Sequence, residues 1–111
     1  MSRFLIKRAF KELQKRCHQI AKSKGFWDED RNDGEMIALM HSELSEALEG
    51  LRHGNPPSDK IKEFSSVEEE FADCIIRILD TAEARNYRLI EAILAKLEYN
   101  SRRPYKHGKG F

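Results

Sequence analysis

The sequence predicts a single all-α domain over residues 1–111, built as a four-helix bundle. Two observations lead to this prediction. Apolar residues recur at steps of three and four in four separate blocks, and glycine- and proline-containing breaks at residues 24–25 and 53–57 divide the chain between blocks. No β-type alternation of useful length is present. Amphipathic helices with short connections bury their apolar faces against one another, which is the packing of a helical bundle.

The first helix is predicted from Arg3 to Ser23, where one apolar stripe runs along the block. Cys17 belongs to this stripe, and Cys74 occupies a similar apolar position in the third block. We interpret both as buried free thiols that act as small hydrophobic residues, because a disulfide is not expected in a reducing compartment. The stripe consists of Ile6, Phe10, Leu13, Cys17 and Ile20.

The second helix is predicted from Asp33 to Arg52. Asp33 is the candidate N-cap, and Gly54 lies just past the expected end. Met36 and Leu39 are further apolar residues beyond the main stripe of this helix. The main stripe consists of Ile37, Met40, Leu44, Ala47, Leu48 and Leu51.

The third helix is predicted from Ser66 to Asn86, where Ser66 and Glu69 have the spacing of a capping box. The fourth is predicted from Arg88 to Arg102, followed by a basic and aromatic tail. Both blocks carry one apolar stripe, as a bundle requires. The two stripes consist of Val67, Phe71, Cys74, Ile75, Ile78 and Ala82, and of Leu89, Ile93, Leu94 and Leu97.

The charge of the chain is nearly balanced, with 20 basic and 19 acidic residues. This balance argues against a disordered tail and against a general nucleic-acid binder, so no stable binding to nucleic acid is expected. No stretch approaches the roughly 20 apolar residues of a membrane span. The first residues carry charges too early for the apolar run of a signal peptide. We therefore expect a cytoplasmic protein with no membrane partner.

Two pairs of acidic residues stand out on the second and third predicted helices. Glu43 and Glu46 form one pair, and Glu70 and Asp73 form the other. Residues three apart in a helix are neighbours on one face, so each pair presents two carboxylates side by side. Both pairs flank the apolar stripe of their helix, and antiparallel packing of the two helices would bring all four carboxylates together.

Four converging carboxylates repel one another unless cations occupy the cluster. An all-oxygen set without histidine or cysteine suits Mg²⁺, or Mn²⁺, better than Zn²⁺ or copper. A di-iron carboxylate bundle is not indicated, because none of the four histidines stands three residues after a glutamate, as that motif requires. The alternative is that both acidic pairs belong to ordinary solvated helix faces.

The order and spacing of these acids resemble the pattern of the MazG-like all-α nucleotide pyrophosphatases. The pattern here is Glu43 and Glu46, then 23 intervening residues, then Glu70 and Asp73. Residues 35–49 are similar to the first metal-binding helix of that family, and residues 68–73 resemble the second. Residues 96–109 look like the C-terminal segment of its short, single-domain members. The resemblance covers most of the chain from Gly25 onward, whereas the first helix is generic.

This resemblance implies Mg²⁺-dependent hydrolysis of (deoxy)nucleoside triphosphates to the monophosphate and pyrophosphate, as housecleaning of the nucleotide pool. It assigns Glu43, Glu46, Glu70 and Asp73 as the metal ligands and as the catalytic carboxylates. One of them, or a nearby acid such as Glu69, would accept the proton of the attacking water. Which of them does so stays open.

Basic and polar residues near the C-terminus are candidate ligands for the triphosphate. Lys96, Asn100 and Arg103 recur at steps of four and three and share a face if the helix persists to the following proline. Together with Lys106 they would contact phosphate oxygens, for which arginine and lysine are suited. The alternative is a basic solvated terminus.

Three further residues have candidate roles near the substrate. Asp80 lies on the same line of the third helix as the acidic pair, and it would anchor the substrate or support a metal ligand, or else form a salt bridge with Arg77 or Lys96. The aromatic pair Phe26-Trp27 precedes the second helix, and an aromatic residue there, assigned as Trp27, would stack on a base, or else anchor the core. Arg31 is a polar residue that could reach the substrate. The preferred base and sugar stay open.

A domain of this size with four broad apolar stripes exposes part of them as a monomer. We therefore expect a homodimer or homotetramer, which is also the assembly that the resemblance implies. Some relatives of this family have lost activity. A non-catalytic helical interaction module that keeps the fold is consequently the alternative function.

Overall fold

The computed structural model describes residues 2–111; Met1, the first residue of the predicted domain, lies outside the described residues. Within the described part the chain forms four α-helices and one short 3-10 helix, so the predicted all-α class is confirmed. None of these helices combines the length and the apolar character needed to cross a bilayer. The helices are α1 (Arg3–Ser23), α2 (Asp33–Arg52), α3 (Ser66–Arg85) and α4 (Leu89–Ser101), followed by η1 (Tyr105–Gly108).

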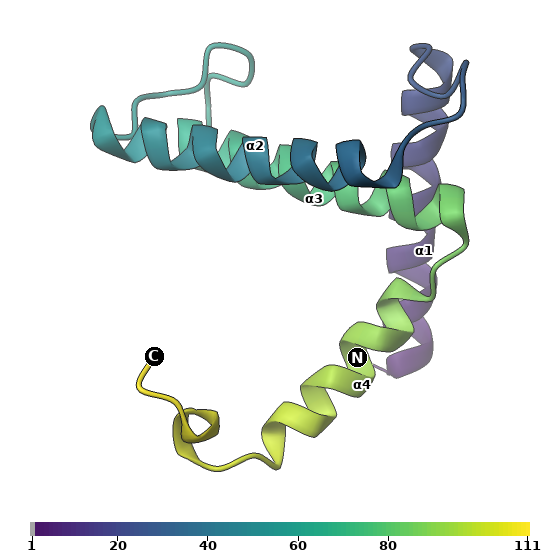
Figure 1. Ribbon diagram of the computed structural model, residues 1–111, viewed down its shortest axis with the longest axis vertical. Helices are drawn as coiled ribbons and strands as arrows, with labels where there is room; N and C mark the ends of the chain where they lie inside the picture. The colour runs from purple at the N-terminus through teal and green to yellow at the C-terminus, as the bar shows by residue number, and fades with distance from the viewer. Residues whose placement is uncertain (1) are drawn as a thin grey trace.

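The helices α2 and α3 form an antiparallel pair, and α1 packs across α3 (Figure 1). Helix α4 packs against α1 and leads the chain away from the α2–α3 pair, so that the C-terminus lies well apart from it (Figure 1). The buried apolar residues lie where these helices meet. They are Cys17, Met36, Ala47, Cys74, Leu79, Ala82 and Ile90.

Helix α2 presents a different face to α3 than its main apolar stripe. Met36, which lies beyond the main stripe, is only 2% exposed, whereas Leu48 of the stripe is 52% exposed. The face that meets α3 contains small residues that allow close approach. A Cβ atom added at Gly50 would lie 3.1 Å from the Cβ of Ser66. Close packing along this narrow face buries Ala47 but leaves the larger residues Ile37, Leu44, Leu48 and Leu51 of the apolar stripe about half exposed.

The uncovered stripe of α2 lies beside an uncovered stripe of α3. Ile37 of α2 and Ile78 of α3 line one small hollow on this side of the pair. Helical spacing places further apolar residues on the same side, up to about four turns along α2 and two turns along α3. We call this surface the apolar face; its large exposed members are Ile37, Leu44, Leu48 and Leu51 of α2, and Phe71 and Ile75 of α3.

The helix starts differ by one residue from the predicted caps. The N-cap of α2 is Asn32, whose side chain accepts a hydrogen bond from the backbone of Glu35 at 3.1 Å, and not Asp33. The capping box of α3 uses Ser65 and Glu68 rather than Ser66 and Glu69. In α3 the pair Ser65 and Glu68 and the pair Ser66 and Glu69 both have the three-residue spacing of a capping box, because serine and glutamate each occur twice in a row. Because Ser65 and Glu68 form the capping box, the side chain of Glu69 is available for contacts outside the cap.

A candidate metal centre beside a cationic cavity

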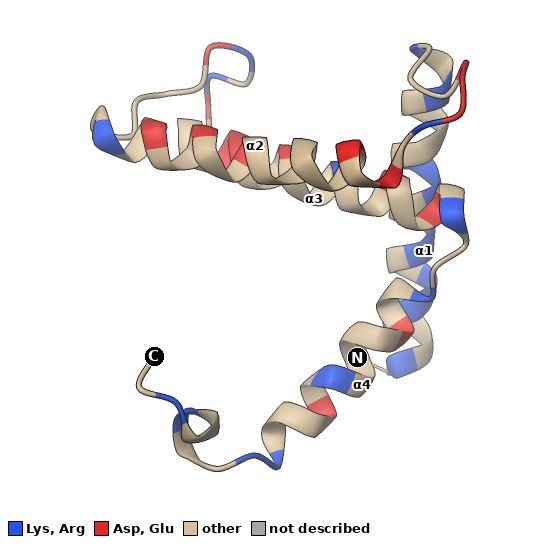
Figure 2. Ribbon diagram, viewed as in Figure 1, with Lys and Arg blue, Asp and Glu red and all other residues tan. Residues whose placement is uncertain are grey.

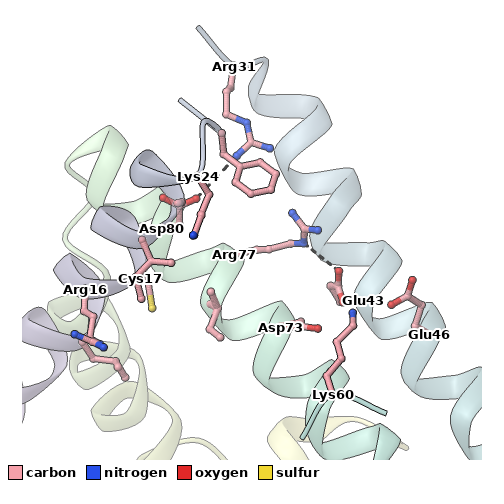
Figure 3. Close-up of a pocket in the computed structure, with 15 residues that line it drawn as sticks. Arg16, Cys17, Lys24, Arg31, Glu43, Glu46, Lys60, Asp73, Arg77 and Asp80 are labelled. Carbon is pink, nitrogen blue, oxygen red and sulfur yellow. Dashed lines mark hydrogen bonds and ion pairs between the residues drawn. The ribbon is translucent and has the colours of Figure 1, made fainter. Parts of the chain in front are cut away.

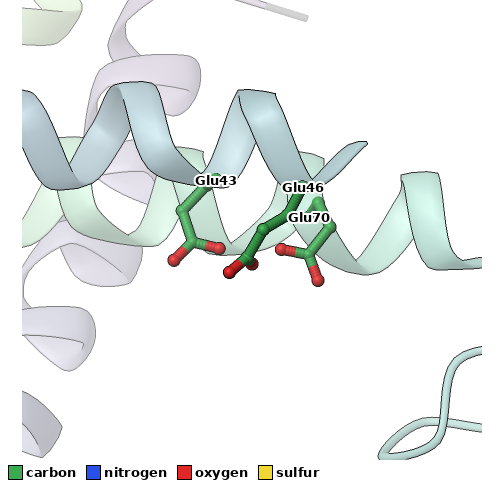
Figure 4. Close-up of side chains that lie close together, drawn as sticks. All are labelled: Glu43, Glu46 and Glu70. Atoms are coloured by element: carbon green, nitrogen blue, oxygen red, sulfur yellow. The ribbon is translucent and has the colours of Figure 1, made fainter. Parts of the chain in front are cut away.

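The two acidic pairs converge between α2 and α3, as the sequence predicts. Glu43, Glu46 and Glu70 each place one carboxylate oxygen within 4.8 Å of the others (Figure 4). Glu69, Glu70 and Asp73 satisfy the same criterion. Glu70 therefore belongs to both groups and connects them into one cluster, which we call the carboxylate cluster.

Burial varies across the carboxylate cluster. Glu43 is 7% exposed, Glu70 is half-buried, and Glu46 is exposed. One oxygen of Glu43 and one of Glu70 are buried without a hydrogen-bond partner among the described residues. A buried carboxylate oxygen without a partner costs free energy, so the arrangement favours a ligand that can satisfy it.

The electrostatics of the cluster resist full ionisation. Burial, followed by hydrogen bonding with and repulsion from Glu46 and Glu43, raises the pKa of Glu70 to about 8. Burial also raises the pKa of Asp73, with repulsion from Glu43 and Glu69 acting in the same direction. Buried carboxylates that repel one another are stabilised when one of them binds a proton or when the group binds a cation.

Two basic side chains lie against the cluster. Arg77 Nε lies 3.1 Å from an oxygen of Glu43, and Lys60 Nζ lies 3.8 Å from an oxygen of Glu69. The loop that carries Lys60 also buries Ser58, whose hydroxyl donates to Glu69. The loop between α2 and α3 therefore holds Glu69 in place, and Glu69 belongs to the same group of acids as Glu70 and Asp73.

The cluster opens onto a cavity of about 580 Å³ between α1, α2 and α3 (Figure 3). Carboxylates line one part of it, and Phe26 and apolar residues of α1 line another. The whole first helix is rich in lysine and arginine, whereas α2 carries mainly acidic charges (Figure 2). The basic side chains that line the cavity are Arg16, Lys24, Arg31, Lys60 and Arg77.

Asp80 lines the same cavity and ties three segments together. It is 6% exposed and accepts a hydrogen bond from Trp27 Nε1 at 2.9 Å. His18 Nδ1 lies 2.8 Å from the same carboxylate, and Arg31 Nη1 lies 3.9 Å from it. The expected alternative partners of Asp80, Arg77 and Lys96, do not pair with it. Asp80 thus joins α1 and the loop after it to α3.

The aromatic residue that reaches the cavity is Phe26 rather than Trp27. The Trp27 ring is enclosed by polar neighbours, with Arg31 Cζ at 5.2 Å from its centroid and Arg85 Cζ at 5.6 Å. Phe26 lines the cavity and lies 5.9 Å from the same Arg31 Cζ. Within one chain, Trp27 is therefore placed as an anchor of the loop and not against the cavity.

The structure does not bring the C-terminal candidates to the carboxylate cluster of the same chain. Helix α4 ends at Ser101 and does not persist to the proline, which was the condition for a shared helical face. Lys96 and Arg103 nevertheless both lie over the Tyr99 ring, and Arg103 Nη1 is 3.4 Å from Asn100 Oδ1. These contacts lie at the end of α4, which leads away from the α2–α3 pair (Figure 1). Lys106 follows it in η1.

Four basic residues of the cavity were not identified from the sequence: Arg16, Lys24, Lys60 and Arg77. For Arg77 a signal was present, because it lies four residues after Asp73 on the same line of α3. The sequence holds no such signal for Arg16 and Lys24, because whether they reach the cavity depends on how α1 crosses α3.

Comparisons with known proteins add no relative to this picture. The chain matches no protein-family model, no curated protein and no solved structure.

The raised pKa of Glu70 predicts how the stability of the metal-free protein depends on pH. The folded state holds a proton on Glu70 more tightly than the unfolded chain, so this group's contribution to the free energy of unfolding falls as pH rises from about 4.5 to about 8. Denaturant unfolding in EDTA across this range measures the decline. Glu70→Gln should make it shallower.

The matched control is Glu49→Gln, which removes the same charge from α2 at an exposed site paired with Arg52 and His53. This variant should show the same decline of the unfolding free energy with pH as the unmodified protein. Identical slopes for all three proteins would contradict the assigned pKa of Glu70.

Proposed function

We propose that this protein is a Mg²⁺-dependent hydrolase that converts (deoxy)nucleoside triphosphates to the monophosphate and pyrophosphate, in the manner of the MazG-like enzymes it resembles. One observation carries the proposal. A cluster of carboxylates with unpartnered buried oxygens opens directly onto a cavity lined by five basic side chains. A surface that offers sites for both a hard cation and an extended anion suits a metal-bound polyphosphate.

The residues present fit Mg²⁺ or Mn²⁺. Glu43, Glu46, Glu70 and Asp73 supply only oxygen atoms, and the unpartnered oxygens of Glu43 and Glu70 need a donor or a cation. These four side chains would hold the ion. When bound, Mg²⁺ neutralises phosphate charge and lowers the pKa of a water ligand.

The remaining groups of the cavity bind and orient the substrate. Arg16, Lys24 and Arg31 would contact the phosphate oxygens that point away from the carboxylates, because their charges line the same cavity. Phe26 offers an aromatic surface for the base. A carboxylate of the cluster, or Glu69 beside it, accepts the proton of the attacking water. The volume of about 580 Å³ lies in the ordinary range for small-molecule sites.

We further propose that the protein assembles as a homodimer or homotetramer through the apolar face. Its six large residues are each about half exposed, which is unusual for a contiguous surface in a monomer. A neighbouring subunit that packs there would also offer the route by which Lys96, Asn100, Arg103 and Lys106 reach a cavity. The predicted role of these residues therefore depends on assembly.

Substitution of the carboxylates tests the enzymatic proposal. Glu43→Gln, Glu46→Gln, Glu70→Gln and Asp73→Asn should each lower kcat/KM by roughly 100-fold or more, since loss of even an outer partner of a metal ligand costs 10- to 100-fold. Pyrophosphate release from a panel of dNTPs with Mg²⁺ measures this, and EDTA should abolish the release.

Glu49→Gln is the control for charge and should retain activity. Circular dichroism verifies that the helices persist in each variant. Absence of pyrophosphate release from every nucleotide in the panel would favour the non-catalytic interaction module, and full activity in two of the four variants would remove the ligand assignment.

Light scattering at micromolar concentration tests assembly. The unmodified chain should have a mass of at least two subunits, and Leu48→Lys should lower it, because a charge in the apolar face opposes burial. Ser45→Lys introduces the same charge at an exposed polar position of α2 and should leave the mass unchanged. A monomeric mass for the unmodified chain would contradict the proposal.

A further inference from the structure

Arg77 occupies the border between the carboxylate cluster and the cationic part of the cavity. It lies on α3, four residues after Asp73 and three before Asp80, and its side chain extends toward α2 (Figure 3). Its Nε atom lies 3.1 Å from Glu43 Oε1. Within residues 2–111, this is the one ion pair that the structure gives to the four proposed ligands.

The contact uses a small part of what Arg77 offers. A guanidinium has five N–H donors, and only Nε donates to a described residue here. The side chain keeps 33% of its surface exposed, and it lines the cavity together with Arg31 and Lys24. The terminal nitrogens are therefore available to an anionic ligand in that cavity.

Glu43 is placed to receive a cation from either of two sources. Its Oε1 accepts from Arg77, while its Oε2 is buried without a partner among the described residues. One of the two Glu43 oxygens lies within 4.8 Å of a carboxylate oxygen of Glu46 and of Glu70. A divalent ion held by these three carboxylates would stand close to the guanidinium. The two cations would repel each other and compete for the charge of Glu43.

We propose that Arg77 exchanges partners: it pairs with Glu43 when the cluster is metal-free, and it binds a phosphate group of the substrate when the cluster holds Mg²⁺. This rests on the proposed function, and it adds a residue that couples the two binding events. Arg77 opposes the binding of a metal ion without substrate, because it competes for Glu43. It favours the binding of a metal ion together with a polyphosphate, because it then contacts the phosphate. By reciprocity, the polyphosphate binds better to the loaded protein than to the metal-free one.

Two binding measurements with opposite expected signs test the exchange. With Mn²⁺ alone, followed by electron paramagnetic resonance, Arg77→Gln should lower the Kd about five-fold or more, because the competitor for Glu43 is gone. With Mn²⁺-saturated protein, calorimetric titration with inorganic pyrophosphate should show a Kd raised about ten-fold or more, because a charge-assisted contact is lost. A residue with a merely structural role would not shift the two affinities in opposite directions.

Arg16→Gln is the matched control for the metal arm. Arg16 lines the same cavity and carries the same charge, but it forms no ion pair with a described residue. Its substitution should change the Mn²⁺ affinity much less than Arg77→Gln does. Arg77→Lys is the second variant if Arg77→Gln does not fold, and it should show both shifts with smaller size, because lysine keeps the charge and loses the fork.

Unchanged or weaker Mn²⁺ binding in the Arg77 variants overturns the competition with metal. Unchanged pyrophosphate binding overturns the second half of the exchange. If the unmodified protein hydrolyses no nucleotide while both shifts are present, the proposed function fails and the partner exchange stands for a phosphate ligand that is bound without being hydrolysed.

Discussion

Repulsion among the carboxylates held between α2 and α3 is the constraint to which the rest of the site responds. The two helices approach closely, and this approach buries Glu43 and part of Glu70. The protein meets the resulting cost in two ways. Glu70 keeps its proton to an unusually high pH, and Arg77 neutralises Glu43. In the proposed function a divalent cation would take the place of both, and the cluster described here would be its metal-free form.

The cavity is held open on its other side by a separate polar network. Asp80 is as deeply buried as Glu43, but its charge is compensated by Trp27, His18 and Arg31. This network fixes the loop after α1, and with it the position of Phe26 and Arg31 at the cavity. The two buried carboxylates therefore differ in their partners: Glu43 keeps one oxygen without a partner among the described residues, whereas Asp80 is contacted by side chains of two other segments.

The sequence predicts those features that depend on local spacing. Periodicity locates all four helices, and the three-residue spacing of the acids predicts their convergence once α2 and α3 are antiparallel. The predicted capping box of α3 is one residue too late, because Ser66 and Glu69 have the same spacing as Ser65 and Glu68, which form the box in the structure. Apolar periodicity shows that a stripe exists but not what it meets, so it does not reveal that Leu48 and its large apolar neighbours stay half exposed in the single chain. The cations of α1 and the direction of α4 depend on helix crossings, about which local sequence carries little information.

Titration calorimetry of the metal-free protein with Mg²⁺, in buffers of different ionisation enthalpy, tests most directly that this cluster is a metal centre. Because the pKa of Glu70 is raised to about 8, we expect Glu70 to hold its proton near pH 7 and Mg²⁺ binding to release it. The release should vanish well above pH 8 and in Glu70→Gln, which should also bind Mg²⁺ more weakly. Absence of Mg²⁺ binding, or binding near neutral pH without proton release, would contradict the account.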